Sequence, residues 1–165
     1  PNGFGVVEIK NILNQLNKTF KIMVDNKIMH SDIKLKNILV KNEKDKNFIV
    51  KLCDFGISKK LETLSNSNFI GTFETMAPEI IKGEHYDNKC DLWSLGVIIY
   101  KLCFKQYHYN GQSTIAIMKQ IEQKKKNYFK RTNDEQLNDL IRKLLKPEPE
   151  ERLTWDQYFN HPFFK

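Results

Sequence analysis

The sequence is poor in cysteine, which restricts the kinds of site it can hold. Cys53, Cys90 and Cys103 are the only cysteines in 165 residues, and no two of them form a close metal-binding pair. An odd number of widely spaced cysteines is typical of reduced thiols inside a cell. We therefore expect neither zinc nor disulfides, and an intracellular, most readily cytoplasmic location, with a nuclear one left open.

Long hydrophobic runs are also missing. No apolar stretch approaches the roughly 20 residues of a membrane-spanning helix, so we expect no membrane span. A composition of 40% hydrophobic and 28% charged residues is that of an ordinary globular domain, and the length suits one domain with a sizeable core. The chain starts at Pro1 without Met or a targeting leader, and we interpret it as an incomplete piece.

Acidic residues are outnumbered, and the formal net charge is +7. Nucleic-acid binding is one interpretation of that excess. The lysines are scattered, however, and the one dense run, Lys124 to Lys126, closes a predicted helical segment. We interpret this run as a solvated helix end and expect no nucleic-acid partner.

Hydrophobic periodicity predicts a mainly α-helical fold with one small hairpin. Apolar residues recur at three- and four-residue intervals from Val6 to Val24, as on one face of an amphipathic helix. Two short, partly β-branched runs at 37–40 and 48–53 flank a charged turn and predict a hairpin. Residues 91–100 are apolar on nearly every side, which predicts a buried helix.

Capping patterns predict three further helices after the buried one. Ser113 is a candidate start for the first of them. Thr132-x-x-Glu135 and Thr154-x-x-Gln157 have the pattern of a capping box, in which side chain and backbone satisfy each other's free donors. We expect the last two helices to begin there.

Three short motifs occur in order along the chain: HSDIKLKN at 30–37, DFG at 54–56 and MAPE at 76–79. Each could arise by chance, but the three in this order and at this spacing could not plausibly do so. Together they resemble the catalytic loop, the metal-binding loop and the end of the activation segment of a protein kinase. The resemblance implies the C-terminal lobe of the kinase-like α+β fold, a helical bundle with a small β hairpin at the active site.

The resemblance also implies a role for individual residues. Asp32 would orient the substrate hydroxyl and accept its proton, while Lys34 would contact the γ-phosphate. Asn37 and Asp54 are oxygen donors of the kind that Mg²⁺ prefers, and they match the metal ligands of the family. The implied nucleotide-binding residues are Lys34, Asn37, Leu39 and Asp54. The implied cofactors are ATP and Mg²⁺.

Two features resemble the serine/threonine form of the family. Lys34 stands two residues after the catalytic aspartate, and Gly71-Thr72 precedes the third motif. In the family this threonine hydroxyl bridges the catalytic Asp and Lys. The implied activity is transfer of the γ-phosphoryl group of Mg-ATP to Ser or Thr hydroxyls of a protein substrate.

Supporting contacts follow from the same resemblance. Glu79 and Arg152 match an ion pair that ties the activation segment to the later helices. Asp91 matches an aspartate that accepts backbone N–H bonds from the catalytic loop, and it could equally cap a helix. His30 matches a packing residue and is not expected to take part in the chemistry.

One position departs from the family pattern. Ser31 stands where the family usually has an arginine, which receives the phosphate of a modified activation loop through bidentate bonds. The polar span 58–68 is a predicted loop with three candidate phosphosites, Thr63, Ser65 and Ser67. Because a serine hydroxyl cannot replace the guanidinium, we expect control by phosphorylation of this loop to be weak.

The sequence also lacks a Gly-rich loop and a strand lysine before His30. Gly3-Phe4-Gly5 has no third glycine and leads into a helical stripe, so we reject it as a phosphate loop. We therefore expect residues 1–165 to form a partial kinase domain without the N-terminal, ATP-covering lobe. By itself, this chain should be inactive.

Two other functions stay open. A pseudokinase scaffold would bind protein partners without catalysis, but the retained Asp32, Lys34, Asn37 and Asp54 argue against it. A lone helical interaction module with accidental motifs would give no reason for the hairpin between Asn37 and Asp54.

Overall fold

The computed structural model describes residues 3–42, 48–56, 58–60, 73–111, 113–124 and 129–165. The helices are α1 (Val6–Asp25), α2 (Pro78–Ile81), α3 (Lys89–Phe104), α4 (Thr114–Lys124), α5 (Glu135–Leu144) and α6 (Trp155–Phe159), with short 3₁₀ turns η1 (Leu35–Asn37) and η4 (Pro162–Phe164). The strands are β1 (Ile28–Met29), β2 (Ile38–Asn42), β3 (Phe48–Leu52) and β4 (Lys59–Lys60). The mainly helical fold with a small hairpin is thus confirmed.

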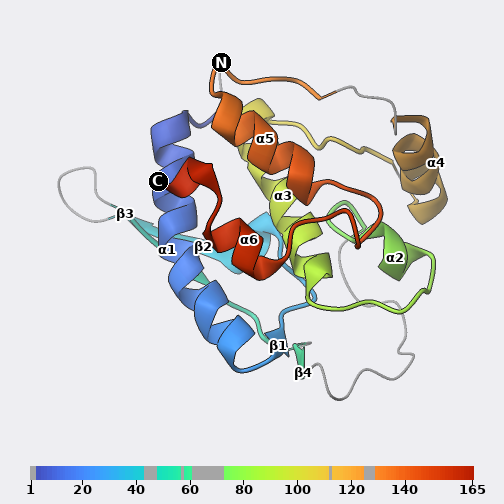
Figure 1. Ribbon diagram of the computed structural model, residues 1–165, viewed down its shortest axis with the longest axis horizontal. Coiled ribbons are helices and arrows are strands. Elements are labelled where there is room, and N and C mark those ends of the chain that lie inside the picture. The colour runs from blue at the N-terminus through green and yellow to red at the C-terminus, as the bar shows by residue number, and fades with distance from the viewer. Residues whose placement is uncertain (1–2, 43–47, 57, 61–72, 112, 125–128) are drawn as a thin grey trace.

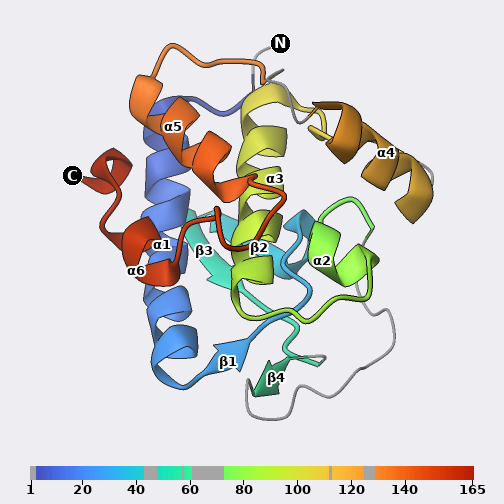
Figure 2. The same ribbon diagram turned by 45° about the vertical axis from the view of Figure 1, so that its right-hand side comes forward.

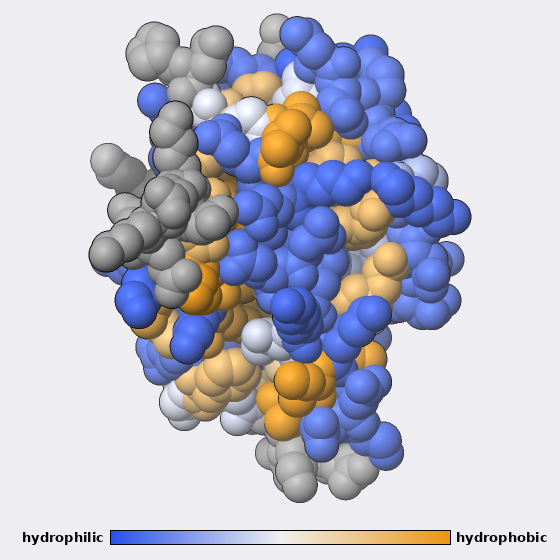
Figure 3. All heavy atoms as spheres, turned by 90° about the vertical axis from the view of Figure 1, so that its left-hand side faces the viewer, coloured by the Kyte–Doolittle hydropathy of each residue, from blue (hydrophilic) through white to orange (hydrophobic). Residues whose placement is uncertain are grey.

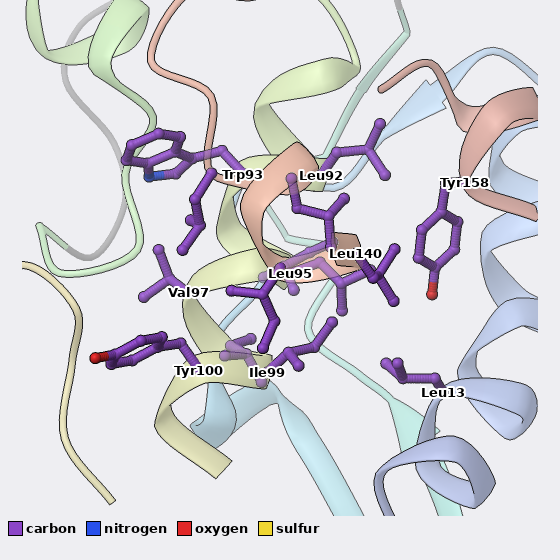
Figure 4. Packing of buried hydrophobic residues seen from close by; sticks show 14 of the residues in the cluster. Leu13, Leu92, Trp93, Leu95, Val97, Ile99, Tyr100, Leu140 and Tyr158 are labelled. Atoms are coloured by element: carbon purple, nitrogen blue, oxygen red, sulfur yellow. The ribbon is translucent and has the colours of Figure 1, made fainter. Parts of the chain in front are cut away.

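Helix α3 passes through the centre of the molecule, with α1 on one side and α5 close against it (Figures 1 and 2). Residues 90–100 of α3 are all buried, because other elements surround the helix. Figure 4 shows its side chains meeting Leu13 of α1, Leu140 of α5 and Tyr158 of α6. The predicted buried helix is confirmed, and it carries the core.

Helix α3 approaches α5 closely at Gly96. A Cβ atom placed on Gly96 would lie 2.8 Å from Cβ of Leu144 and 3.1 Å from the side chain of Leu145. Contacts this short do not occur between real side chains, so glycine is needed for the two helices to pack at this spacing.

The predicted amphipathic helix is confirmed as α1. Its buried residues are Ile9, Ile12, Leu13, Leu16, Phe20 and Met23. The end of the chain packs along this helix, where the Tyr158 hydroxyl donates to Oδ1 of Asn17 at 2.8 Å. In the view of Figure 3, hydrophilic residues predominate and hydrophobic ones form separate groups between them.

The predicted hairpin is confirmed as β2 and β3. The strands are antiparallel, with Ile38 opposite Leu52 and Asn42 opposite Phe48. Gln15 of α1 closes one edge of β3, since its amide donates to the Phe48 carbonyl at 3.1 Å and accepts from Val50 N–H at 2.9 Å. The hairpin is therefore held against α1 by hydrogen bonds between the Gln15 side chain and the backbone of β3.

A second small sheet was not predicted. Strand β4 pairs antiparallel with β1, with Ile28 opposite Lys60 and Met29 opposite Lys59. The prediction of a loop from Ser58 onward is therefore wrong for Lys59 and Lys60, because backbone pairing with β1 holds them in a strand. Residues 61–68 of that predicted loop lie outside the described part of the chain.

Two of the three predicted helix starts are confirmed. The Ser113 hydroxyl accepts from Ala116 N–H at 3.2 Å at the start of α4, and Thr154 forms a reciprocal capping box with Gln157 at α6. The prediction at Thr132 is wrong. Asp134 caps α5 by accepting from Leu137 N–H at 2.7 Å.

The Thr132 hydroxyl is engaged elsewhere. It accepts from Asp134 N–H at 3.2 Å and donates to Oδ1 of Asn138 at 3.0 Å, which stabilises a turn before the helix. Within the described ranges, no helix is long and apolar enough to cross a membrane.

Candidate active site

The motif at 30–37 forms a loop between β1 and β2 that is fixed to the first turn of α3. The Asp91 carboxylate accepts from His30 N–H at 2.7 Å and from Ser31 N–H at 2.9 Å. Asp91 is buried, and burial raises its pKa to about 7 while the two N–H donors limit the rise. The predicted role of Asp91 as an acceptor for this loop is confirmed.

Two residues of the motifs have a left-handed backbone. Ser31, next to Asp32, has φ of 68°, and Asp54 has φ of 65°. Side chains make this conformation unfavourable by about 1–2 kcal/mol, so the surrounding contacts must hold both residues in place. The Ser31 hydroxyl is itself buried and has no hydrogen-bond partner among the described residues.

Asp32, Lys34 and Asn37 come together in this loop. The Lys34 ammonium group lies 2.5 Å from Oδ2 of Asp32. The Asn37 amide donates to the Asp32 carbonyl at 2.9 Å and to Oδ2 at 3.2 Å. Asp32 is only 8% exposed, so the two donors fix a largely buried carboxylate.

The hairpin brings the second motif to the same end of the sheet. Cys53 N–H donates to the Asn37 carbonyl at 2.9 Å, so Asp54 leaves β3 beside the residue at which β2 begins. Gly56 N–H lies 3.4 Å from Oδ1 of Asp54. Asn37 and Asp54 are therefore neighbours across the hairpin end, as the sequence predicted.

These residues fit a magnesium ion that is also held by phosphate oxygens. Asn37 directs its side-chain nitrogen toward Asp32, and its side-chain oxygen Oδ1 receives no hydrogen bond from the described residues. Within the described residues, no three His, Cys, Asp or Glu side chains form a group that could hold a metal ion on its own. Mg²⁺ commonly takes one or two protein ligands and completes its shell with phosphates and water.

His30 packs beneath the loop as expected. Its Nδ1 accepts from Asp32 N–H at 3.3 Å, and Nε2 lies 3.1 Å from the Cys53 carbonyl. Nδ1 therefore carries no proton, and burial lowers the pKa of the ring. The ring also lies 4.8 Å from that of Phe55, so His30 joins the first two motifs.

Leu39 lies on β2, two residues beyond Asn37, and is 54% exposed. A leucine that is this accessible, close to Asn37 in the chain, is available to a bound molecule. Thr72, Thr63, Ser65 and Ser67, which sequence reasoning had singled out, lie outside the described residues.

The third motif is anchored by a buried ion pair. The Arg152 guanidinium binds both oxygens of Glu79 at 2.7 and 2.9 Å, and neither side chain is more than 2% exposed. It also donates to the carbonyls of Lys89, Lys146 and Pro147. The predicted pairing of Glu79 with Arg152 is confirmed, and it ties α2 to α3 and to the segment before α6.

Sequence reasoning missed one anchor of this motif. The Ser94 hydroxyl of α3 donates to the Thr75 carbonyl at 2.7 Å. A serine inside an otherwise apolar, buried run was the available signal, because a hydroxyl in such a place needs a partner.

Comparison with known proteins gives matches along nearly the whole chain. A family model described as "Protein kinase domain" matches residues 2–164. The serine/threonine-protein kinase ATG1b of Arabidopsis thaliana is 34% identical over 158 residues, which cover 93% of this chain and 22% of that protein.

Two further relatives come from other organisms. The serine/threonine-protein kinase atg1 of Dictyostelium discoideum is 33% identical over 90% of this chain and 22% of its own length. Calcium-dependent protein kinase 4 of Plasmodium falciparum is 32% identical over 98% of this chain and 31% of its own length. The chain thus spans less than a third of the length of each of these relatives.

Proposed function

Because the chain belongs to the protein kinase domain family, we propose that its parent protein is an active serine/threonine kinase. In this proposal the parent transfers the γ-phosphoryl group of Mg-ATP to Ser or Thr hydroxyls of a protein substrate. The observation that carries it is the Asp32 carboxylate, which Lys34 and Asn37 hold beside the hairpin end where Asp54 emerges.

The proposed roles follow from chemistry and position. Asp32 orients the acceptor hydroxyl and takes up its proton, and Lys34 supplies positive charge to the transferred phosphoryl group. Asn37 and Asp54 hold Mg²⁺, and Leu39 contacts the nucleotide. Bound Mg-ATP supplies the phosphoryl group and the metal charge that neutralises it. Since phosphoryl transfer depends mainly on positioning, the fixed loop is the contribution of this chain.

We also propose that residues 1–165 form the C-terminal lobe of the kinase domain. The sequence holds the three motifs of that lobe but no Gly-rich loop and no strand lysine. An N-terminal lobe would complete the nucleotide site, so the isolated chain should not turn over. The sparse, separated cysteines are compatible with action in a reducing, cytoplasmic compartment.

The experiment compares Asp32→Asn and Asp54→Asn in the parent protein. Both should abolish transfer of labelled phosphate to a protein substrate. Asp54→Asn should also weaken binding of Mg-ATP through loss of a ligand charge, whereas Asp32→Asn should leave nucleotide affinity nearly unchanged. The matched control is Asp25→Asn, which changes an exposed carboxylate at the end of α1.

Nucleotide titrations of the variants then decide the assignment. Equal loss of Mg-ATP affinity in Asp32→Asn and Asp54→Asn would contradict the separate roles. A parent that binds no Mg-ATP and transfers no phosphate would instead be a pseudokinase scaffold, one of the two alternatives that the sequence leaves open.

A further inference from the structure

A hollow lies away from the proposed active site, where the segment before α5 runs along that helix. Its volume is about 270 Å³. The lining residues are Phe129, Lys130, Arg131, Asn138, Ile141 and Arg142. We call this surface the α5 basic pocket. Figure 1 shows the orange segment that leads to the start of α5.

The walls of the α5 basic pocket are fixed by contacts within the chain. Oδ1 of Asn138 accepts from Thr132 N–H at 2.8 Å, and its amide donates to the Thr132 carbonyl at 3.0 Å. These bonds hold the segment that carries Lys130 and Arg131 against α5. A pocket fixed in this way needs little ordering when something binds, which favours affinity.

The lining includes one aromatic side chain, which is supported from within the chain. Phe129 stacks on the His108 ring at a centroid distance of 4.2 Å and an interplanar angle of 11°. His108 is only 4% exposed, so this face of Phe129 is supported from within. Ile141 is buried behind the lining, so Phe129 is the main apolar surface that the pocket offers.

The positive charges of the pocket are only partly compensated. Arg142 pairs with Asp139, whose carboxylate also receives Lys143 at 2.7 Å and His161 at 3.1 Å. Burial alone would raise the pKa of Asp139, but these donors outweigh it and lower that pKa. Lys130 and Arg131 are exposed, and neither pairs with an acidic side chain of the described ranges. The rim therefore has a net positive charge.

We propose that the α5 basic pocket docks an acidic segment of a partner protein, in which carboxylates flank an apolar side chain. Guanidinium groups bind carboxylates through paired, charge-assisted bonds, and Arg131 and Arg142 both line the hollow. The apolar side chain would cover the accessible face of the half-buried Phe129, which a bare anion would leave in water. This interaction uses none of the residues of phosphoryl transfer and therefore goes beyond the proposed function.

The test measures the fluorescence anisotropy of a labelled peptide with phenylalanine between two pairs of glutamates, titrated with this chain. We expect saturable binding that weakens by at least about tenfold in Lys130→Glu/Arg131→Glu. The matched control is Lys18→Glu/Lys51→Glu, which makes the same charge change at exposed lysines outside the pocket. The control should bind within about twofold of the unchanged chain.

Peptide variants separate the two parts of the proposed recognition. Replacing the glutamates with glutamine, or the phenylalanine with serine, should each weaken binding. Far-UV circular dichroism checks the fold. If the charge-reversed variant fails to fold, Lys130→Gln/Arg131→Gln takes its place.

Three results would overturn the proposal. Equal weakening in the pocket and control variants would show general attraction by net charge. Absence of saturable peptide binding would show that the pocket does not dock such segments. Binding to phosphatidylserine vesicles that depends on Lys130 and Arg131, without binding to the peptide, would assign the surface to a membrane instead.

Discussion

At the scale of single residues, Ser31 combines two unfavourable features in one position. Its backbone is left-handed and its buried hydroxyl lacks a partner among the described residues. The Asp91 carboxylate holds this conformation through the N–H bond of Ser31. The loop is therefore strained next to Asp32, the proposed base, and the strain is retained by contacts with α3.

We predict that Ser31→Gly stabilises the chain by about 1 kcal/mol. Glycine removes about 1–2 kcal/mol of left-handed strain and also the cost of the unpaired hydroxyl. Against this, the greater flexibility of glycine in the unfolded chain costs about 0.5–1 kcal/mol of entropy on folding. Urea denaturation measures the change. Ser31→Ala is the control, because it removes the hydroxyl but keeps the strain. A Gly variant less stable than the Ala variant would contradict the strain at this position.

Asp91 predicts a pH dependence of stability. Its folded pKa of about 7 lies above the unfolded value of 3.8, so between these values the folded state binds more protons than the unfolded state. The stabilising contribution of the protonated group is complete below the unfolded pKa. It is lost as the pH rises through the folded pKa.

The measurement compares the chain with Asp91→Asn, which does not titrate. The unfolding free energy of the unchanged chain minus that of Asp91→Asn should decrease as the pH rises from 5 to 7.5. If this difference stays constant or increases with pH, the N–H donors of His30 and Ser31 outweigh burial in setting the pKa of Asp91.

At the scale of elements, the Glu79–Arg152 pair joins α2, α3 and the segment before α6. We predict that Arg152→Ala lowers the unfolding free energy by about 3–5 kcal/mol, since it leaves the Glu79 carboxylate buried without a partner. Urea denaturation again measures the change. The control, Arg142→Ala, removes an exposed arginine on α5 and should cost less than about 1 kcal/mol.

A double variant separates charge from packing in the same region. Glu79→Gln/Arg152→Met removes both charges while keeping comparable volume, so it should be less destabilised than Arg152→Ala alone. If the double variant is the less stable of the two, the other bonds of Arg152, to the carbonyls of Lys89, Lys146 and Pro147, dominate its contribution.

The elements that the sequence predicted are those with a strong local signal. Helix α1 follows from its apolar stripe, and the β2–β3 hairpin follows from two runs around a charged turn. The β1–β4 pair could not be predicted, because two-residue strands carry no periodicity and pair across a distance in the chain. Asp134 was overlooked since Thr132-x-x-Glu135 matches the capping pattern equally well, and only the bond with Asn138 decides between them.

Some contacts of the functional surfaces could be predicted from the sequence, and others could not. The motifs predicted the contacts of Asp91 and Glu79, because the resemblance supplies their partners. The α5 basic pocket joins Lys130 and Arg131 to Arg142 through the turn at Thr132, and no local pattern predicts that approach.

At the scale of the whole molecule, one hydrophobic cluster joins the main helices. It includes buried residues of α1, α3, α5 and α6 and of strand β3. The ring of Trp93 of α3 stacks on that of Tyr109, with a centroid distance of 5.7 Å. The ring centroids of Trp155 of α6 and Phe20 of α1 lie 5.2 Å apart. The two tryptophans therefore report on different sides of the same core.

We predict that the chain unfolds in a single cooperative transition, because a continuous core cannot lose one side without exposing the other. In Trp93→Phe the remaining fluorescence reports Trp155, and in Trp155→Phe it reports Trp93. Within each variant, the urea midpoint by fluorescence should equal the midpoint by far-UV circular dichroism. If the fluorescence of Trp93 in Trp155→Phe has its midpoint at a lower urea concentration than circular dichroism, the side of α3 that faces Tyr109 unfolds separately. The core would then consist of two units.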